Sequence, residues 1–237
     1  MTMHQALSLG RNTKFALGAA LALDHAAWLH HYRGEARETL DTAEADLKLT
    51  TEHGFSFFLA QGTILRGWAL AKLGQNAEGI TRIKQGLGAH AATGAQLVRP
   101  YWMALLAGAY ADGGKAKQGL HLLGEAFAMA GDQHLWSAEL HRMRGELLLL
   151  SGRAASDEDL SVTEAELCFR QALAIASGQR AKALELRAAT SLARLWRDQG
   201  KRAEAFDLLA PVYGWFTEGL STSVLQEAKA LLAELMP

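Results

Sequence analysis

The sequence of 237 residues has one cysteine, three prolines, no long apolar run and no excess of charge of one sign. Cys168 alone can form no disulfide within the chain and offers no CxxC pair for zinc or redox chemistry, which predicts a cytoplasmic setting. The longest nearly continuous apolar run, residues 101–111, is too short to cross a bilayer. The first residues also lack the apolar core of a signal peptide. These absences predict a soluble protein.

The charged residues nearly balance, with 24 Lys and Arg against 25 Asp and Glu. A net charge near zero argues against a dedicated nucleic-acid or anionic-membrane surface. β-Branched residues are sparse beside alanine and leucine, and this bias together with the scarcity of proline favours helices. We therefore expect an all-α chain without a membrane-binding surface, in which only a local stripe of arginines could bind nucleic acid.

A pattern of small and apolar residues recurs about every 40 residues, a period typical of helical repeats. In the second helix of each expected hairpin, a small residue is followed four positions later by an apolar residue and then by another small one. The occurrences are Ala36/Leu40/Ala43, Gly79/Ile83/Gly86, Gly119/Leu123/Ala126, Ala165/Phe169/Ala172 and Ala205/Leu209/Val212. Glycines expected to stop the first helices form a matching series: Gly74, Gly114, Gly152 and Gly200. Such a period predicts a solenoid whose units bury their faces against their neighbours.

The pattern predicts about five helical hairpins and a final helix, forming one right-handed superhelical domain over residues 1–237. First helices are expected near 14–31, 55–73, 97–112, 133–151 and 180–199, and second helices near 34–53, 76–93, 116–130, 161–178 and 202–217. Residues 222–235 form an amphipathic helix that is expected to cap the array. Residues 153–163 are expected to be an exposed loop, and Pro211 should kink or end the last second helix near Leu208 to Ala210.

Small residues recur within the first helices at the place where the two helices of a hairpin should touch. They are Gly67, Ala107, Gly145 and Ala193. Large residues follow at the next turn and should fill the groove beside each contact. They are Leu70, Tyr110, Leu148 and Trp196.

The N-terminal end of the array differs from its C-terminal end. Residues 1–11 read as the last turns of a second helix whose first helix is missing. An uncapped repeat edge exposes apolar surface. The pattern therefore predicts either that the chain is a fragment of a longer protein or that two copies form a homodimer through this edge.

Nucleotide binding is not supported by the sequence. Residues 109–116 imitate a P-loop at Gly114 and Lys115, but Ala109 replaces the first glycine and Ala116 replaces the hydroxyl that would bind magnesium. The segment also follows an expected helix rather than a strand, so its glycines are better interpreted as a turn between helices.

Metal binding and nucleophilic catalysis find no support either. Nine histidines include the adjacent pair His30 and His31, and His134 and His141 on one helix, but no pair has the HExxH spacing of a zinc site. Cys168 lies on an apolar stripe, as expected of a small core residue. We expect no enzyme activity, no cofactor and no bound metal.

A concave groove lined by the first helices remains as the candidate binding surface. Aromatic residues and arginines dominate the energetics of many protein interfaces, and the expected groove contains both. Its residues are His25, Trp28, Gln61, Trp68, Lys72, Tyr101, Asp112, Glu139, Arg142, Glu146, Arg187, Arg194, Arg197 and Asp198. Two interpretations stay open: the groove clamps a peptide or a domain, or the tryptophans pack between repeats while the arginines form a solvated face.

Four segments resemble the C-terminal tetratricopeptide-like region of large bacterial regulatory ATPases. They are GFSFFLAQGTILRGWALAKLGQ (54–75), AELHRMRGELLL (138–149), AELCFRQALAIA (165–176) and SLARLWRDQGKRAEAFDLLAPVYGWFTEG (191–219). Members of that group often carry a cyclase or DNA-binding domain and a P-loop ATPase, which this chain lacks. The resemblance implies a non-catalytic arm that binds a protein, a peptide or neighbouring domains of a longer chain. A sensor that binds a metabolite near Trp68, Tyr101, Arg142 and Glu146 is the alternative.

Overall fold

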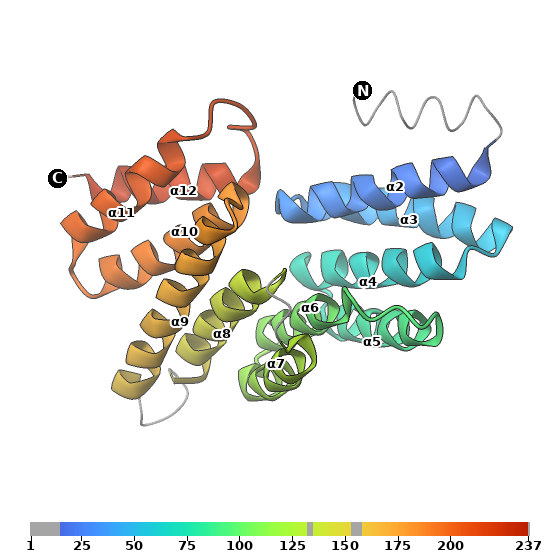
Figure 1. Ribbon diagram of the computed structural model, residues 1–237, viewed down its shortest axis with the longest axis horizontal. Coiled ribbons are helices and arrows are strands. Elements are labelled where there is room, and N and C mark those ends of the chain that lie inside the picture. The colour runs from blue at the N-terminus through green and yellow to red at the C-terminus, as the bar shows by residue number, and fades with distance from the viewer. Residues whose placement is uncertain (1–14, 132–134, 153–157, 237) are drawn as a thin grey trace. The chain divides into compact units, whose positions relative to one another are not determined.

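The computed structural model describes residues 15–131, 135–152 and 158–236, which contain eleven α-helices and no strand (Figure 1). The helices are α2 Ala16–Tyr32, α3 Ala36–His53, α4 Ser56–Lys72, α5 Asn76–Ala92, α6 Arg99–Asp112, α7 Ala116–Ala130, α8 Ser137–Gly152, α9 Glu158–Gly178, α10 Lys182–Asp198, α11 Arg202–Gly214 and α12 Ser223–Leu235. The expected all-α fold is confirmed, and the helices lie within a few residues of their expected ranges.

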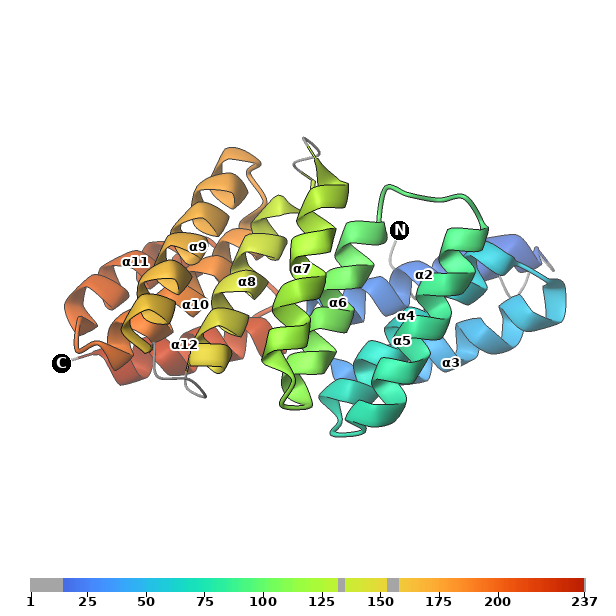
Figure 2. The ribbon, with the colours of Figure 1, turned by 90° about the horizontal axis from the view of Figure 1, so that it is seen from below.

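The chain divides into two compact units, residues 1–114 and residues 115–237. Unit 1 holds α2 to α6: α2 packs on α3, α3 on α4, α4 on α5, and α6 lies against both α4 and α5. Unit 2 holds α7 to α12: α7 packs on α8, α8 on α9, α9 on α10 and α10 on α11 (Figure 2). Within each unit, consecutive helices therefore form the stacked hairpins that the repeat predicts.

Glycines follow most of the first helices in a left-handed conformation. Gly74, Gly114 and Gly200 have φ angles of 87°, 75° and 80°, in the region that glycine adopts without steric cost. This confirms their expected role as helix stops. Gly152 belongs to the same series and is the last residue of α8.

Two hairpins show the expected close approach of their helices. A Cβ atom on Gly67 of α4 would lie 2.8 Å from the carbonyl oxygen of Gly79 and 2.8 Å from the backbone nitrogen of Ile83 in α5. In unit 2, a Cβ atom on Gly145 of α8 would lie 2.5 Å from Cε1 of Phe169 in α9. Real Cβ atoms need more room than this, so glycine is what lets these helices pack so closely.

In the first hairpin, the buried contact series differs from the predicted Ala36/Leu40/Ala43. The fully buried residues of α3 include Thr39, Ala43 and Asp46, which lie about one helical turn later. They match the series of the other hairpins when Gly34 is aligned with Gly74. The prediction was wrong here because Thr39 and Asp46 are polar, so a pattern of small and apolar residues passes over them.

Two local predictions near the later hairpins also need correction. Helix α9 begins at Glu158, so residues 158–163 form its first turns and not an exposed loop, while 153–157 lie outside the described residues. Acidic residues near a helix N-terminus favour the helix through its dipole. Pro211 does not end α11, which continues to Gly214, so of the two predicted effects only a kink stays a prediction. Pro211 is exposed, so water can satisfy the carbonyl group that its missing N–H leaves without a partner.

The final helix lies within one residue of its predicted bounds and covers the last hairpin. Its residues Leu225, Ala228, Leu231 and Leu235 are buried in one core cluster with residues of α10 and α11. Those partners are Leu186, Ala189, Ala193, Ala205 and Leu209. Helix α12 therefore shields apolar surface that the hairpin of α10 and α11 would otherwise expose.

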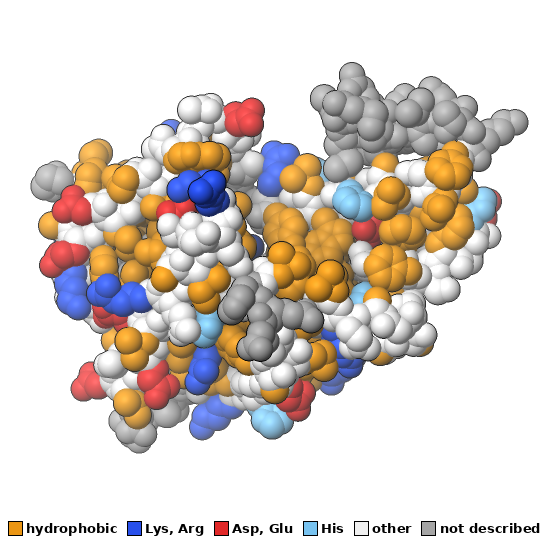
Figure 3. Space-filling model, in the orientation of Figure 1, with side chains coloured by type: hydrophobic (Ala, Val, Ile, Leu, Met, Phe, Trp, Pro, Cys, Tyr) orange, Lys and Arg blue, Asp and Glu red, His pale blue; other side chains and the backbone are white. Residues whose placement is uncertain are grey.

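The start of the described chain exposes apolar side chains, whereas residues 1–11 lie outside the described residues. Phe15 is 59% exposed, and Leu17, Leu21 and Leu29 of α2 are 44%, 46% and 42% exposed. Figure 3 shows apolar side chains over the part of the molecule where α2 lies. In the fifth hairpin the matching helix, α10, buries Leu195 at the place of Leu29, in one cluster with Ala165 and Phe169 of the preceding hairpin. Among the described residues, the equivalent face of α2 therefore stays partly exposed.

Candidate functional site

Aromatic side chains from three first helices of unit 1 meet in one cluster. Trp28 of α2 lies 4.3 Å from Trp102 of α6 between ring centroids, and it stacks on Tyr101 at 5.6 Å. The ring of Trp68 in α4 meets His31 of α2 edge-on at 4.2 Å. Such ring pairs stabilise a fold beyond the area that they bury. The cluster therefore ties α2, α4 and α6 together.

Hydrogen bonds join the same helices. The indole N–H of Trp28 donates to Oε1 of Gln61 at 3.0 Å, and the hydroxyl of Tyr101 lies 2.6 Å from Nε2 of His31. Gln61, Trp68 and Tyr101 are 4%, 9% and 0% exposed. These three candidate residues belong to the packed interior, while Trp28 is half-buried.

Three members of this cluster were not predicted as site residues: His31, Tyr32 and Trp102. His31 and Tyr32 follow Trp28 by one helical turn, and that spacing could have identified them as its neighbours. Trp102 is adjacent to Tyr101 and should point to another side of α6, so only the folded structure brings both rings onto Trp28.

Beside the cluster, the candidate residue Lys72 of α4 is already paired. Its Nζ lies 2.8 Å from Oδ2 of Asp112 in α6, and both side chains are partly exposed. An exposed ion pair of this kind contributes about 0–1 kcal/mol to stability. Lys72 therefore links two first helices, in the same way as the aromatic rings.

In unit 2, the candidate charges of α8 and α10 form a network. The guanidinium of Arg142 donates to both oxygens of Glu139, at 2.6 Å and 3.0 Å, and it also donates to Glu146. Arg187 of α10 lies 2.7 Å from Glu139, and the hydroxyl of Ser191 donates to Glu146 at 3.0 Å. Glu139 and Arg142 are buried, and these mutual contacts compensate for the lost hydration.

Two arginines of α10, Arg194 and Arg197, also form ion pairs within the chain. Arg194 lies 2.9 Å from Glu227 of α12, and Arg197 lies 2.6 Å from Glu234 of α12 and 2.9 Å from Asp198. The hydrogen bonds that Arg197 donates to Asp198 and Glu234 raise the pKa of its guanidinium above the ordinary value. These arginines thus help to attach α12, a role that helical spacing could not predict because the partners lie far away in the sequence.

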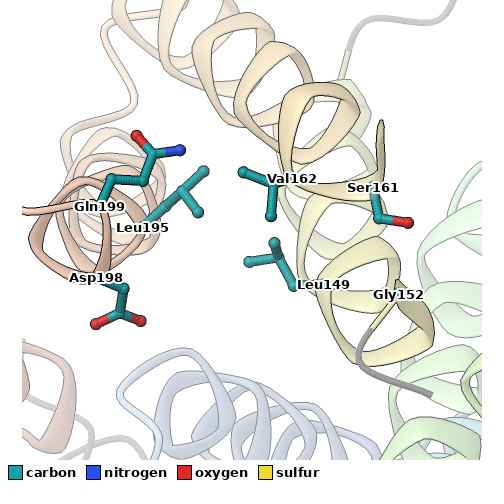
Figure 4. A pocket seen from close by; sticks show the side chains of 7 residues that line it. All are labelled: Leu149, Gly152, Ser161, Val162, Leu195, Asp198 and Gln199. Carbon is teal, nitrogen blue, oxygen red and sulfur yellow. The ribbon is translucent and has the colours of Figure 1, made fainter. Parts of the chain in front are cut away.

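An open hollow lies between α8 and α10 beside these arginines. It has a volume of about 330 Å³. Its apolar lining consists of Leu149, Leu150, Leu195 and Phe169 of α9. Glu146, Ser191, Arg194, Arg197 and Asp198 provide its polar lining. A smaller hollow of about 170 Å³ adjoins it, where Leu149, Val162 and Leu195 point toward one another (Figure 4).

The nine histidines of the sequence were the main candidates for metal ligands, and no metal site was expected. Within residues 15–131, 135–152 and 158–236, no group of three or more His, Cys, Asp or Glu side chains is placed to hold a metal ion. His134 lies outside the described residues. Burial and the nearby Arg144 lower the pKa of His141, and the side chain packs against Phe127 at 4.8 Å between ring centroids.

Cys168 is half-buried and unbonded. Burial raises the pKa of its thiol, which disfavours the reactive thiolate. In the described part of the chain, no helix combines the length and the apolar character needed to cross a membrane.

No protein-family model and no curated protein matches this sequence. Among solved structures, the chain is similar to a single-substitution variant of a Podosopora anserina kinesin light chain with nearly identical TPR-like repeats. The TM-score is 0.53 and the sequence identity is 20%, and the match covers 81% of this chain and 92% of that chain. This chain has a TPR-like repeat fold. A second structure of the same TPR-like repeats gives a TM-score of 0.51 and 18% identity over 90% of this chain and 94% of that chain.

Proposed function

We propose that this TPR-like chain is a non-catalytic scaffold with a regulatory role. It binds a protein or peptide on the surface that the first helix of each hairpin presents, the first-helix surface. TPR-like repeats in general serve as interaction surfaces, because their stacked hairpins present extended faces built from many repeats. The observation that carries the proposal is the open hollow between α8 and α10, with apolar walls and a charged lining.

The finer part of the proposal is that the array belongs to a bacterial signalling ATPase. It is supported by the resemblance of residues 54–75, 138–149, 165–176 and 191–219 to the helical region of such proteins. A cytoplasmic location and an interaction with neighbouring domains of a longer chain follow from this assignment.

The lining of the hollow indicates which chemistry would bind there. Arg194 and Arg197 already pair with carboxylates, and Glu146 already accepts hydrogen bonds from Arg142 and Ser191. Apolar contact with the leucines is therefore the main source of affinity that remains. We expect the occupant to be a large apolar side chain presented by a peptide or by a domain, and we expect binding to depend only weakly on salt.

Leu150 offers a sharp test because it lines the hollow and is 44% exposed. Peptides selected from a random phage-displayed library on the full chain serve as probes, and their affinities are measured by fluorescence polarisation. Leu150→Glu should weaken their binding at least about tenfold, or about 1.4 kcal/mol. Leu167→Glu is the matched control, because Leu167 is 62% exposed on the second helix α9 and does not line the hollow.

Two results would contradict peptide binding on the first-helix surface. If Leu150→Glu leaves every selected peptide bound while Leu167→Glu releases them, partners bind the second-helix face and the first-helix surface is not the binding site. A selection that gives no saturable binder would also count against a peptide-binding scaffold.

A metabolite sensor is the second candidate, because 330 Å³ lies at the lower end of the volumes of small-ligand sites, about 300–1,000 Å³. The candidate residues for this role do not share one unit: Trp68 and Tyr101 belong to unit 1, and Arg142 and Glu146 belong to unit 2. The hollow is also open, which favours a peptide. A small molecule that raises the melting temperature of the parent but not of Leu150→Glu would favour the sensor.

The exposed apolar face of α2 supports the further proposal of a homodimer through the N-terminal edge. Leu21 and Leu29 lie two helical turns apart on this face. If two copies pair through it, Leu21→Glu should convert a dimer into a monomer in sedimentation velocity experiments. A parent chain that is monomeric at all accessible concentrations would contradict this proposal.

A further inference from the structure

An aspartate occupies a helix-contact position in the first hairpin. When the hairpins are aligned on their contact series, Asp46 of α3 is equivalent to a small or apolar residue in every other hairpin. Those residues are Gly86, Ala126, Ala172 and Val212. A carboxylate buried at such a place is costly unless it has hydrogen-bond donors or a positive charge nearby.

The surroundings of Asp46 provide little of either. Asp46 and Asp24 of α2 are 0% and 3% exposed. A Cβ atom on Gly62 would lie 2.7 Å from Oδ2 of Asp46, so the carboxyl group packs directly against α4. Among the described residues, neither oxygen of Asp46 has a hydrogen-bond partner, and Oδ1 of Asp24 has none.

Charged and polar groups on the helices that carry or pack on the pair are mostly engaged by other partners. From α2, Nδ1 of His25 lies 3.9 Å from Oδ2 of Asp24, and the His25 side chain is 63% exposed. Arg66 of α4 is held by Glu44 of α3 at 3.1 Å and by Glu78 of α5 at 3.3 Å. The amide oxygen of Gln61, next to Gly62, accepts the indole N–H of Trp28.

These surroundings favour the neutral carboxyl groups. Burial raises the pKa of Asp24 to about 7, which His25 partly opposes, and burial together with the charge of Asp24 raises the pKa of Asp46 to about 8. The folded first hairpin therefore binds protons more tightly than the unfolded chain. The stability that results is fully present below about pH 4 and is lost as the pH rises through about 7 to 8.

We propose that Asp24 and Asp46 form a pH-sensitive joint: α2 and α3 stay packed on α4 while both carboxyl groups are protonated, and this packing loosens when they ionise. On ionisation each carboxyl releases its proton to solvent, and the two buried negative charges then repel each other, with that of Asp46 packed against Gly62. Helices α2, α3 and α4 lie next to one another in unit 1 (Figure 1), so loosening at this point separates α2 from its support.

The joint connects pH to the aromatic part of the first-helix surface. Helix α2 carries Trp28, which lies one turn beyond Asp24 and contacts Trp102 and Gln61. Movement of α2 would break these contacts and change the shape of the surface in unit 1. An effect of pH on partner binding rests on the proposed function, whereas the joint itself does not.

Hydrogen–deuterium exchange of the full chain at about pH 6 and about pH 9, corrected for the intrinsic exchange rate, tests the joint. Protection of α2 and α3 should fall at least several-fold at the higher pH, while α10 and α12 keep their protection as an internal reference. Asp46→Ala, which copies Ala126 and Ala172, should remove most of this loss. Asp41→Asn, at an exposed aspartate on α3, should leave the loss unchanged.

Two results would overturn the joint: protection of α2 and α3 in the parent that does not change with pH, or a loss that persists in Asp46→Ala. If Asp46→Ala does not fold, Asp24→Thr takes its place, because it copies Thr190 at the matching position of α10 and should reduce the loss in the same way. This readout requires no partner, so it stands or fails independently of the Leu150→Glu binding test.

Discussion

Substitution of Gly67 should reverse the usual effect of replacing a helical glycine by alanine. In an open helical site, alanine stabilises by roughly 0.5–1 kcal/mol because it lowers the conformational entropy of the unfolded chain and has the higher helix propensity. At Gly67 the new Cβ atom would lie 2.8 Å from the carbonyl oxygen of Gly79 and 2.8 Å from the nitrogen of Ile83. Both are backbone atoms, so no side-chain rotation can relieve the clash.

The magnitudes favour destabilisation. Overpacking that moves the backbone typically costs about 1–3 kcal/mol, which exceeds the gain in helix propensity. We expect Gly67→Ala to lower the free energy of unfolding by about 1 kcal/mol, and Gly67→Leu to cost about 3 kcal/mol because the larger side chain separates α4 from α5 further.

Gly88 provides the matched control on the neighbouring helix α5. It is exposed, and a Cβ atom there would meet no atom within 4 Å. Gly88→Ala should therefore stabilise the chain by up to about 1 kcal/mol. Urea unfolding followed by far-ultraviolet circular dichroism measures both changes. A Gly67→Ala variant at least as stable as the parent would refute the close contact between α4 and α5.

Three further perturbations test other contacts. Removal of residues 222–237 should lower the melting temperature and promote aggregation, because the core under α12 loses its cover. A monomeric product with an unchanged melting temperature would show that α12 is not a cap. Charge reversal at Arg194 and Arg197 together should increase amide exchange in α12, since two exposed ion pairs of about 0–1 kcal/mol each are replaced by repulsion. Unaltered exchange would mean that these two arginines do not hold α12 in place. Tyr101→Phe should cost about 1–2 kcal/mol in urea unfolding because the buried contact with His31 is lost, and equal stability would argue against that hydrogen bond.

The helices could be predicted from the sequence because their signals are local and repeated. Left-handed glycines such as Gly74 and Gly200 end the first helices, and small residues such as Gly67 and Gly145 mark the contacts within hairpins. Each signal recurs at the same place in several repeats, so an error in one repeat is corrected by the others. The first hairpin departs from this pattern because polar side chains occupy its contact positions.

The candidate surface was predicted less completely, because helical spacing gives the face of a residue but not its depth. Trp68 and Tyr101 were correctly placed on first helices, yet they are buried by rings from other helices that no local pattern reveals. The partners of Arg194 and Arg197 lie on α12, more than thirty residues away in the sequence. Contacts at such separations are set by tertiary packing and leave no periodic trace.

The two glycine contacts make single helices of different hairpins unsuitable for exchange with one another. In α4 and α5, Gly67 faces the backbone of a second glycine-containing helix, whereas in α8 and α9, Gly145 makes room for the ring of Phe169. A chimera that placed α9 against α4 would bring Phe169 toward a surface shaped for Ile83. Recombination within this array would therefore have to transfer both helices of a hairpin together, so the hairpin is the smallest unit that can be duplicated or shuffled without repacking.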